Sequence, residues 1–251
     1  MSVKPQMDPV ALVGVMRDEW DARARQDARY FICTDLPRDE QAFLASGRDD
    51  YRHHVGSFMQ ASRFDAAGKT ALEIGCGIGR MTRCFAEEFA EVIGLDISAE
   101  MIARARAADI PRARFVVGGG SDLAGIASAA VDFVFSYIVF QHIPEQAVIL
   151  RYFEEIGRVL RPGGLFRIHM NGLPQVRVGR LLLEGYISDS PKLRVLGLRK
   201  LPFVRRRRLG TWLGHPISAP AIRRACRRGG LTVTRVTGRW TVNQWIEGRK
   251  D

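Results

Sequence analysis

Apolar and polar positions follow a helical period over the first part of the chain. Residues 8–27 carry apolar side chains at the spacing of a helix with charges between them, and a second helical stretch runs over residues 39–64. Each stretch has an apolar face that needs a partner surface. We therefore expect residues 1–66 to form an N-terminal helical cap.

From Lys69 the period changes, and short apolar runs alternate with helical segments. Helices are predicted over 80–90, 98–108 and 144–160. This spacing favours βαβ crossovers and a parallel sheet with helices on both faces, which is a doubly wound, Rossmann-like α/β fold. The five runs predicted as strands are TALEI, EVIGLDI, ARFVV, VDFVFSYIV and GLFRIHM.

The alternation stops at Asn171 and resumes near Pro220. A helix over 220–228 and two apolar runs, LTVTRVTG and WTVNQWIEG, predict an antiparallel hairpin at the sheet edge. The sheet would then have seven strands, mostly parallel. Residues 67–170 would be its core, 171–219 a basic insertion forming a substrate lid, and 220–251 the helix and hairpin that complete it.

Composition agrees with a globular chain that can bury a core. Of the 251 residues, 46% are hydrophobic and 26% charged, which argues against disorder and coiled coil. We find neither a leader-like apolar segment nor a run long enough to span a bilayer. The four cysteines have no CxxC spacing, which predicts free thiols in a reducing compartment and no structural zinc site. We expect a cytoplasmic protein.

The net charge of +11 is unevenly distributed. Residues 1–170 hold 20 basic and 23 acidic side chains, whereas residues 171–251 hold 18 basic and 4 acidic ones. Such a segment could face phosphate, an acidic substrate or an anionic lipid surface. A solvated, arginine-rich face is an equally simple interpretation.

A glycine-rich turn follows the first predicted strand. The segment from Glu73 to Arg80 reads EIGCGIGR, so an acidic residue ends the strand and glycines at alternate positions lead into a helix. Such a turn lets a ligand approach backbone N–H groups. The spacing is GxGxG, which differs from the GxGxxG dinucleotide fingerprint, and no GKS or GKT follows.

Other predicted strands also end in glycine or polar residues. Asp96 ends the second, where a carboxylate can accept hydrogen bonds from both hydroxyls of a ribose. The third runs into Gly118-Gly119-Gly120-Ser121-Asp122-Leu123, and the fourth into Gln141-His142-Ile143. Because ligands of such sheets bind beyond the carboxyl ends of the strands, we expect a crevice there.

Four segments of the chain resemble the motifs of class I methyltransferases, which use S-adenosylmethionine. ALEIGCGIGR is similar to their first motif, VIGLDIS to the acidic strand end, VDFVFSYIVFQHIP to the fourth-strand motif and RVLRPGGLFRIHM to the segment after it. The resemblance implies that Asp96 binds the ribose, Ile97 and Met101 enclose the adenine, and Ser136 and Tyr137 line the methionine side. The implied cofactor-binding residues are Glu73, Gly75, Cys76, Gly77, Gly79, Arg80, Asp96, Ile97, Met101, Ser121, Asp122, Leu123, Ser136 and Tyr137.

One position departs from the family pattern. Many relatives have an acidic residue after the first glycine of the third-strand turn, where it binds the adenine amino group, but this chain has Gly119. Either Asp122 or Ser121 takes that role, or backbone groups alone contact the base.

Histidine is the usual base for a neutral hydroxyl acceptor, and His142 follows the fourth strand. We predict it as the catalytic base, although it could simply cap a loop or helix. His169 and His215 are lesser candidates. The pair His53-His54 lies on a predicted helix without HExxH spacing, so we interpret it as surface and predict no metal site.

Aromatic residues outside the motifs have simpler interpretations. Tyr30-Phe31-Ile32 could cover the cofactor as a lid or form an ordinary core turn. Trp20, Trp212, Trp240 and Trp245 are interpreted as packing residues.

The sequence thus predicts a methyltransferase acting on a hydroxyl of a small molecule or sugar. The fourth strand is followed by Ser136-Tyr137-Ile138-Val139 in place of the Asn-Pro-Pro-Tyr type signature of many nucleic-acid amino methylases. Two alternatives remain. One is an RNA or DNA methyltransferase using the basic last third. The other is a non-catalytic S-adenosylmethionine-binding or membrane-surface protein, in which 178–187 and 193–208 contact anionic lipid.

Overall fold

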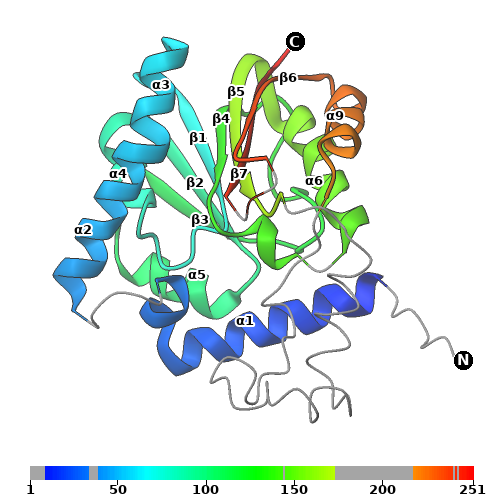
Figure 1. The fold of residues 1–251 in the computed structure, drawn as a ribbon. Coiled ribbons are helices and arrows are strands. Elements are labelled where there is room, and N and C mark those ends of the chain that lie inside the picture. The colour runs from blue at the N-terminus through cyan, green and yellow to red at the C-terminus, as the bar shows by residue number, and fades with distance from the viewer. Residues whose placement is uncertain (1–8, 34–38, 144, 173–216, 240, 242) are drawn as a thin grey trace, which may run out of the picture.

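The fold is a seven-stranded sheet between two layers of helices (Figure 1). A computed structural model describes residues 9–33, 39–143, 145–172, 217–239, 241 and 243–251. The strand order is β3-β2-β1-β4-β5-β7-β6. The strands are β1 (Thr70–Ile74), β2 (Glu91–Asp96), β3 (Ala113–Val117), β4 (Val131–Ser136), β5 (Leu160–Met170), β6 (Leu231–Thr237) and β7 (Gln244–Lys250).

The strand directions confirm the predicted fold class. Strands β1 to β5 are parallel, and β7 runs antiparallel to both β5 and β6. The hairpin therefore enters the sheet through β7, and β6 forms the edge. In this register His169 of β5 lies opposite Trp245 of β7.

Helices cover both faces of the sheet. In Figure 1, α2 to α5 lie on one side of it and α6 and α9 on the other, while α1 crosses below the sheet. The helices are α1 (Pro9–Ile32), α2 (Glu40–Tyr51), the π-helix η1 (Arg52–Gly56), α3 (Ser57–Ser62), α4 (Thr82–Glu88), α5 (Ala99–Ala107), the 3-10 helix η2 (Phe140–His142), α6 (Gln146–Val159) and α9 (Ala219–Arg228).

The central strand β4 shows why the sheet must be covered on both sides. Its side chains at 133, 134 and 135 are all fully buried. Phe133 and Phe135 pack into the cluster that holds Phe85, whereas Val134 belongs to the cluster on the α6 side. A run that is apolar at consecutive positions is what a doubly covered parallel strand requires.

Two element boundaries differ from the sequence prediction for local reasons. Helix α1 is interrupted at Asp27, whose backbone is extended and whose side chain accepts a hydrogen bond from the Tyr30 N–H at 3.1 Å. This cap starts a short second helical segment. Strand β4 ends at Ser136, before the predicted Val139, because Ile138 has a left-handed backbone with φ 57°.

The expected insertion falls mostly outside the described residues, as do the proposed lipid-contacting segments, His215, Trp212 and Trp240. Within the described part of the chain, no helix is long and apolar enough to cross a membrane.

Candidate functional site

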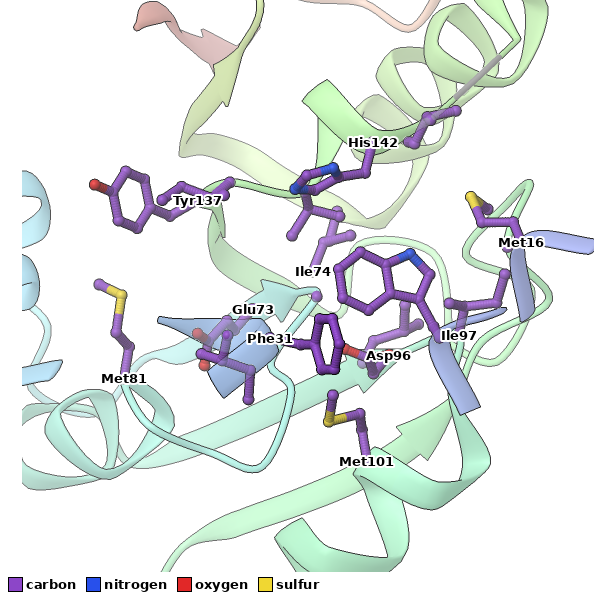
Figure 2. Close-up of a pocket in the computed structure, with 18 of the residues that line it drawn as sticks. Met16, Phe31, Glu73, Ile74, Met81, Asp96, Ile97, Met101, Tyr137 and His142 are labelled. Atoms are coloured by element: carbon purple, nitrogen blue, oxygen red, sulfur yellow. The ribbon is translucent and has the colours of Figure 1, made fainter. Parts of the chain in front are cut away.

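A cavity lies where α1 meets the carboxyl ends of β1, β2 and β4 (Figure 2). The empty space in it, including open solvent at its mouth, is about 980 Å³. Among its walls are eight residues predicted from the sequence: Glu73, Gly75, Arg80, Asp96, Ile97, Met101, Tyr137 and His142.

Asp96 is fixed in the cavity wall by two backbone groups. Its Oδ2 accepts a hydrogen bond from the Gly77 N–H at 3.0 Å, and its Oδ1 accepts one from the Ser98 N–H at 2.9 Å. Burial raises its pKa, and these N–H groups oppose that shift. Ile97 also contributes a backbone hydrogen bond to this carboxylate, and the lone pairs that remain can accept hydrogen bonds from a ligand.

Backbone conformation and close packing explain why this turn contains glycines. Gly75 has φ 78°, and a Cβ built there would lie 2.1 Å from Val139 Cγ2. Gly77 has φ 54°, and its Cβ would lie 2.8 Å from Ile32 Cδ1. A side chain at either position is therefore excluded by strain and by a neighbouring side chain.

Glu73 is a buried acid at the base of the cavity. It is 5% exposed and accepts a hydrogen bond from the Thr82 hydroxyl at 2.6 Å. Burial raises its pKa to about 8, although Thr82 and Arg80 favour the charged form. Arg80 makes an ion pair with Asp50 at 2.7 Å and donates a hydrogen bond to the Ser46 hydroxyl at 3.0 Å.

The end of the cavity away from Glu73 is apolar and holds Ile97 and Met101 (Figure 2). Trp20 and Phe31 of α1 also line the cavity. This arrangement provides flat and aliphatic surfaces beside a carboxylate.

His142 lines the cavity and is 7% exposed. The Trp20 ring packs edge-on against it with 5.4 Å between centroids. His169 is fully buried, and burial lowers its pKa to about 4. Its Nδ1 accepts a hydrogen bond from the Ile138 N–H at 3.3 Å, which favours a structural role for this histidine.

Seven of the predicted residues do not line the cavity: Cys76, Gly77, Gly79, Ser121, Asp122, Leu123 and Ser136. The Ser136 hydroxyl donates a hydrogen bond to the Ile74 carbonyl at 2.8 Å, and Leu123 is fully buried in the core. Asp122 pairs with Arg151 of α6 at 3.4 Å. Cofactor contact by these residues stays a prediction.

Sequence reasoning assigned few cavity residues to α1. Phe31 and Ile32 line the cavity, which supports the lid alternative for that segment, and Trp20 does so as well. The helical period showed that α1 has an apolar face, but the period carries no information about where that face docks. The remaining wall residues are Met16, Ile74, Met81, Leu95, Gly120, Ile138, Val139, Ile143 and Tyr152.

Comparison with known families identifies the domain. Residues 72–168 match a family described as "Methyltransferase domain". This segment begins within β1 and holds the glycine turn, β2 with Asp96, and His142. Residues 72–168 are a class I, S-adenosylmethionine-dependent methyltransferase domain.

Curated methyltransferases are similar to part of this chain. Trans-aconitate 2-methyltransferase of Azoarcus sp. (strain BH72) is 36% identical over 135 residues, which are 53% of this chain and 50% of the relative. Ubiquinone biosynthesis O-methyltransferase of Xanthomonas oryzae pv. oryzae (strain PXO99A) is 30% identical over 118 residues, which are 45% of this chain and 48% of the relative. The matched segments thus span about half the length of these relatives.

A solved methyltransferase structure confirms the fold. Magnesium protoporphyrin IX methyltransferase from Synechocystis PCC 6803, with bound S-adenosylhomocysteine, superposes with a TM-score of 0.63 and 18% sequence identity. The match covers 97% of this chain and all of that one. Within the described residues, no group of histidine, cysteine and acidic side chains is arranged to hold a metal ion.

Proposed function

We propose that this chain transfers a methyl group from S-adenosylmethionine to a hydroxyl oxygen of a small molecule or sugar. The methyltransferase domain supports methyl transfer, and the names of the relatives above support a small-molecule acceptor. The observation that carries the proposal is the cavity, which joins a carboxylate, an apolar end and a histidine.

The cavity fits the proposed cofactor in three respects. The Asp96 carboxylate retains lone pairs that can accept hydrogen bonds from ribose hydroxyls. Ile97 and Met101 provide aliphatic surfaces for an adenine ring. The buried carboxyl of Glu73 lies at the other end, beside Arg80, where the amino and carboxyl groups of a methionine portion would need partners.

When bound, S-adenosylmethionine supplies an electrophilic methyl group on a positively charged sulfur. In the transfer, the acceptor oxygen would form the new bond to the methyl carbon, and the electron pair of the broken carbon–sulfur bond would stay on sulfur. Holding the two reactants in line supplies much of the rate. His142 would accept the hydroxyl proton at a ring nitrogen, and Trp20 against its ring would hold its orientation.

Replacing His142 tests this role. We expect His142→Asn to lower turnover by about 10²- to 10⁴-fold, since a general base contributes about that factor. Affinity for S-adenosylmethionine should stay within about threefold, which is less than 1 kcal/mol. Turnover is measured as transfer of labelled methyl groups across a panel of hydroxylated metabolites and glycans, and affinity by calorimetry.

His53→Ala is the matched control, because His53 is an exposed histidine outside the cavity wall. Full activity of His142→Asn would remove His142 as the base. Failure of the unaltered protein to bind S-adenosylmethionine would contradict the proposed function itself.

A further inference from the structure

Four rings from separate parts of the chain form a cluster beside the cavity. They are His54 of η1, Tyr137 after β4, His169 of β5 and Trp245 of β7. Tyr137 and Trp245 stack with centroids 5.6 Å apart and an interplanar angle of 8°. The His54 ring lies 4.6 Å from the Tyr137 ring and 4.8 Å from the Trp245 ring, measured between centroids.

Tyr137 connects this ring cluster with the proposed cofactor cavity, because it belongs to both. Figure 2 shows the Tyr137 ring on the side of the cavity away from Ile97 and Met101, and pointing away from both. The ring cluster therefore adjoins the cavity at the end away from the proposed adenine site.

A π-helical turn carries His54 to the ring cluster. The π-helix Arg52–Gly56 interrupts the α-helical stretch between α2 and α3. Such turns are rare and occur often at functional sites. Here His53 is exposed, Val55 is fully buried and His54 is half-buried. The predicted surface position is thus correct for His53 and wrong for His54.

His169 holds the turn that presents Tyr137. Its Nδ1 accepts a hydrogen bond from the Ile138 N–H, so the ring proton is on Nε2, which lies 3.4 Å from Asn243 Oδ1. Ile138 has φ 57°, a conformation that is strained for a β-branched residue. Strain of this kind persists only where the surroundings fix it, and it is common at ligand sites.

The surroundings of His54 make the exposed face of the ring cluster uncharged. Burial, together with the nearby His53, Arg167, His169 and Arg80, lowers the pKa of His54 to about 4, so the imidazole is neutral at pH 7. Arg167 pairs with Glu247 at 2.6 Å, and Arg80 pairs with Asp50. A neutral imidazole offers one nitrogen as a hydrogen-bond acceptor.

We propose that His54 and Tyr137, backed by Trp245, bind the methyl acceptor, and that this acceptor is a planar phenol with two neighbouring hydroxyls, one of which donates to His54 while the other is left to react. His54 and Tyr137 are only half-buried in the ring cluster, and a ligand that packs against aromatic rings is favoured when it is itself an aromatic ring and not a saturated one. The inference rests on the proposed function, since it places the phenol next to the methyl donor.

Binding to the complex with S-adenosylhomocysteine tests this site without turnover. The probes are catechol and cyclohexane-1,2-diol, which has two neighbouring hydroxyls but no aromatic ring. Ligand-observed NMR measures their affinities for the unaltered protein and for His54→Ala, His54→Gln and the control Arg52→Ala, which changes an exposed side chain of the same π-helix. Calorimetry first establishes that each variant binds S-adenosylhomocysteine.

We expect catechol to bind more tightly than cyclohexane-1,2-diol, and His54→Ala to weaken catechol binding by about tenfold or more. His54→Gln should restore part of the affinity through its amide oxygen, and Arg52→Ala should leave it unchanged. Equal catechol affinity in His54→Ala, or no catechol binding, would overturn the inference. If S-adenosylhomocysteine also failed to bind, the proposed function would fail with it.

Discussion

The environment of Glu73 keeps its carboxyl group from ionising at its ordinary pH. Its carboxyl is almost completely removed from solvent, and one oxygen accepts the Thr82 hydroxyl. Burial disfavours the charged form by more than Thr82 and Arg80 favour it, so the pKa rises to about 8. The folded protein therefore holds a proton at Glu73 at neutral pH that the unfolded chain has released.

This proton makes stability depend on pH. The pKa of Glu73 is higher in the folded protein than in the unfolded chain, where it is near 4.5. The contribution of Glu73 to stability is therefore fully present below pH 4.5 and is lost as the pH rises toward about 8. One proton gives a slope of at most about 1.4 kcal/mol per pH unit. We expect Glu73→Gln to flatten this slope in urea unfolding at pH 5 to 8. An unchanged slope would mean that Glu73 is already ionised at pH 5.

Residue roles were predictable from the sequence where a strand end fixes the side chain's position. Asp96 and Glu73 both end strands, and both line the cavity. Asp122 lies in a loop, and its direction depends on a partner far away in the sequence, Arg151. The loop sequence alone cannot give that partner.

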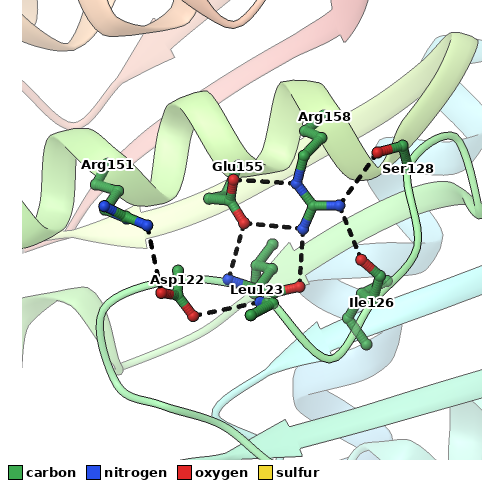
Figure 3. A network of polar contacts seen from close by, with 8 residues as sticks. Asp122, Leu123, Ile126, Ser128, Arg151, Glu155 and Arg158 are labelled. Atoms are coloured by element: carbon green, nitrogen blue, oxygen red, sulfur yellow. Dashed lines mark hydrogen bonds and ion pairs between the residues drawn. The ribbon is translucent and has the colours of Figure 1, made fainter.

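At the scale of elements, the loop between β3 and β4 is anchored to α6 (Figure 3). The Arg158 guanidinium makes two hydrogen bonds to Glu155 and donates to the Leu123 carbonyl at 2.8 Å and the Ile126 carbonyl at 2.9 Å. Glu155 in turn accepts the Leu123 N–H at 3.1 Å. One ion pair thus satisfies several backbone groups and fixes the loop near the cavity.

Removing Arg158 should release this loop. We expect Arg158→Ala to lower the free energy of unfolding by about 2–3 kcal/mol, because two carbonyls and Glu155 lose their partner. Arg151→Ala is the matched control: it removes a more exposed and longer pair on the same helix and should cost about 0.5 kcal/mol or less. Urea denaturation measures both, and equal effects would contradict the anchoring role.

Element types followed from periodicity, whereas boundaries depended on local backbone geometry. The runs TALEI and ARFVV match β1 and β3 residue for residue. Strand β4 ends early because Ile138 adopts a left-handed conformation supported by His169 from the neighbouring strand. The spacing of apolar residues contains no information about that contact.

For the whole molecule, the decisive feature is the docking of α1 across the strand ends. Asp21 accepts hydrogen bonds from the Ser98 hydroxyl at 2.5 Å and the Glu100 N–H at 3.2 Å. Arg17 donates to the Gly119 carbonyl at 3.4 Å. These contacts place Trp20 and Phe31 over the cavity, so a bound ligand would touch the cap and the sheet together.

Hydrogen exchange tests this coupling. A ligand at about 100 times its Kd stabilises the bound state by about 2.7 kcal/mol, so amides in residues 28–33 should exchange up to about 100-fold more slowly with saturating S-adenosylhomocysteine. Peptides from α9, which contributes no residue to the cavity wall, are the internal control. Unchanged exchange in 28–33 alongside ligand binding would show that α1 does not cover the ligand.

The most direct test of the account is a crystal structure of this chain with S-adenosylhomocysteine. We expect the nucleoside in the cavity between α1 and the ends of β1 and β2, with both ribose hydroxyls about 2.5–3.0 Å from the Asp96 carboxylate oxygens. Density for the nucleoside elsewhere, or a cavity filled by Val139 and Trp20 at saturating ligand, would contradict it.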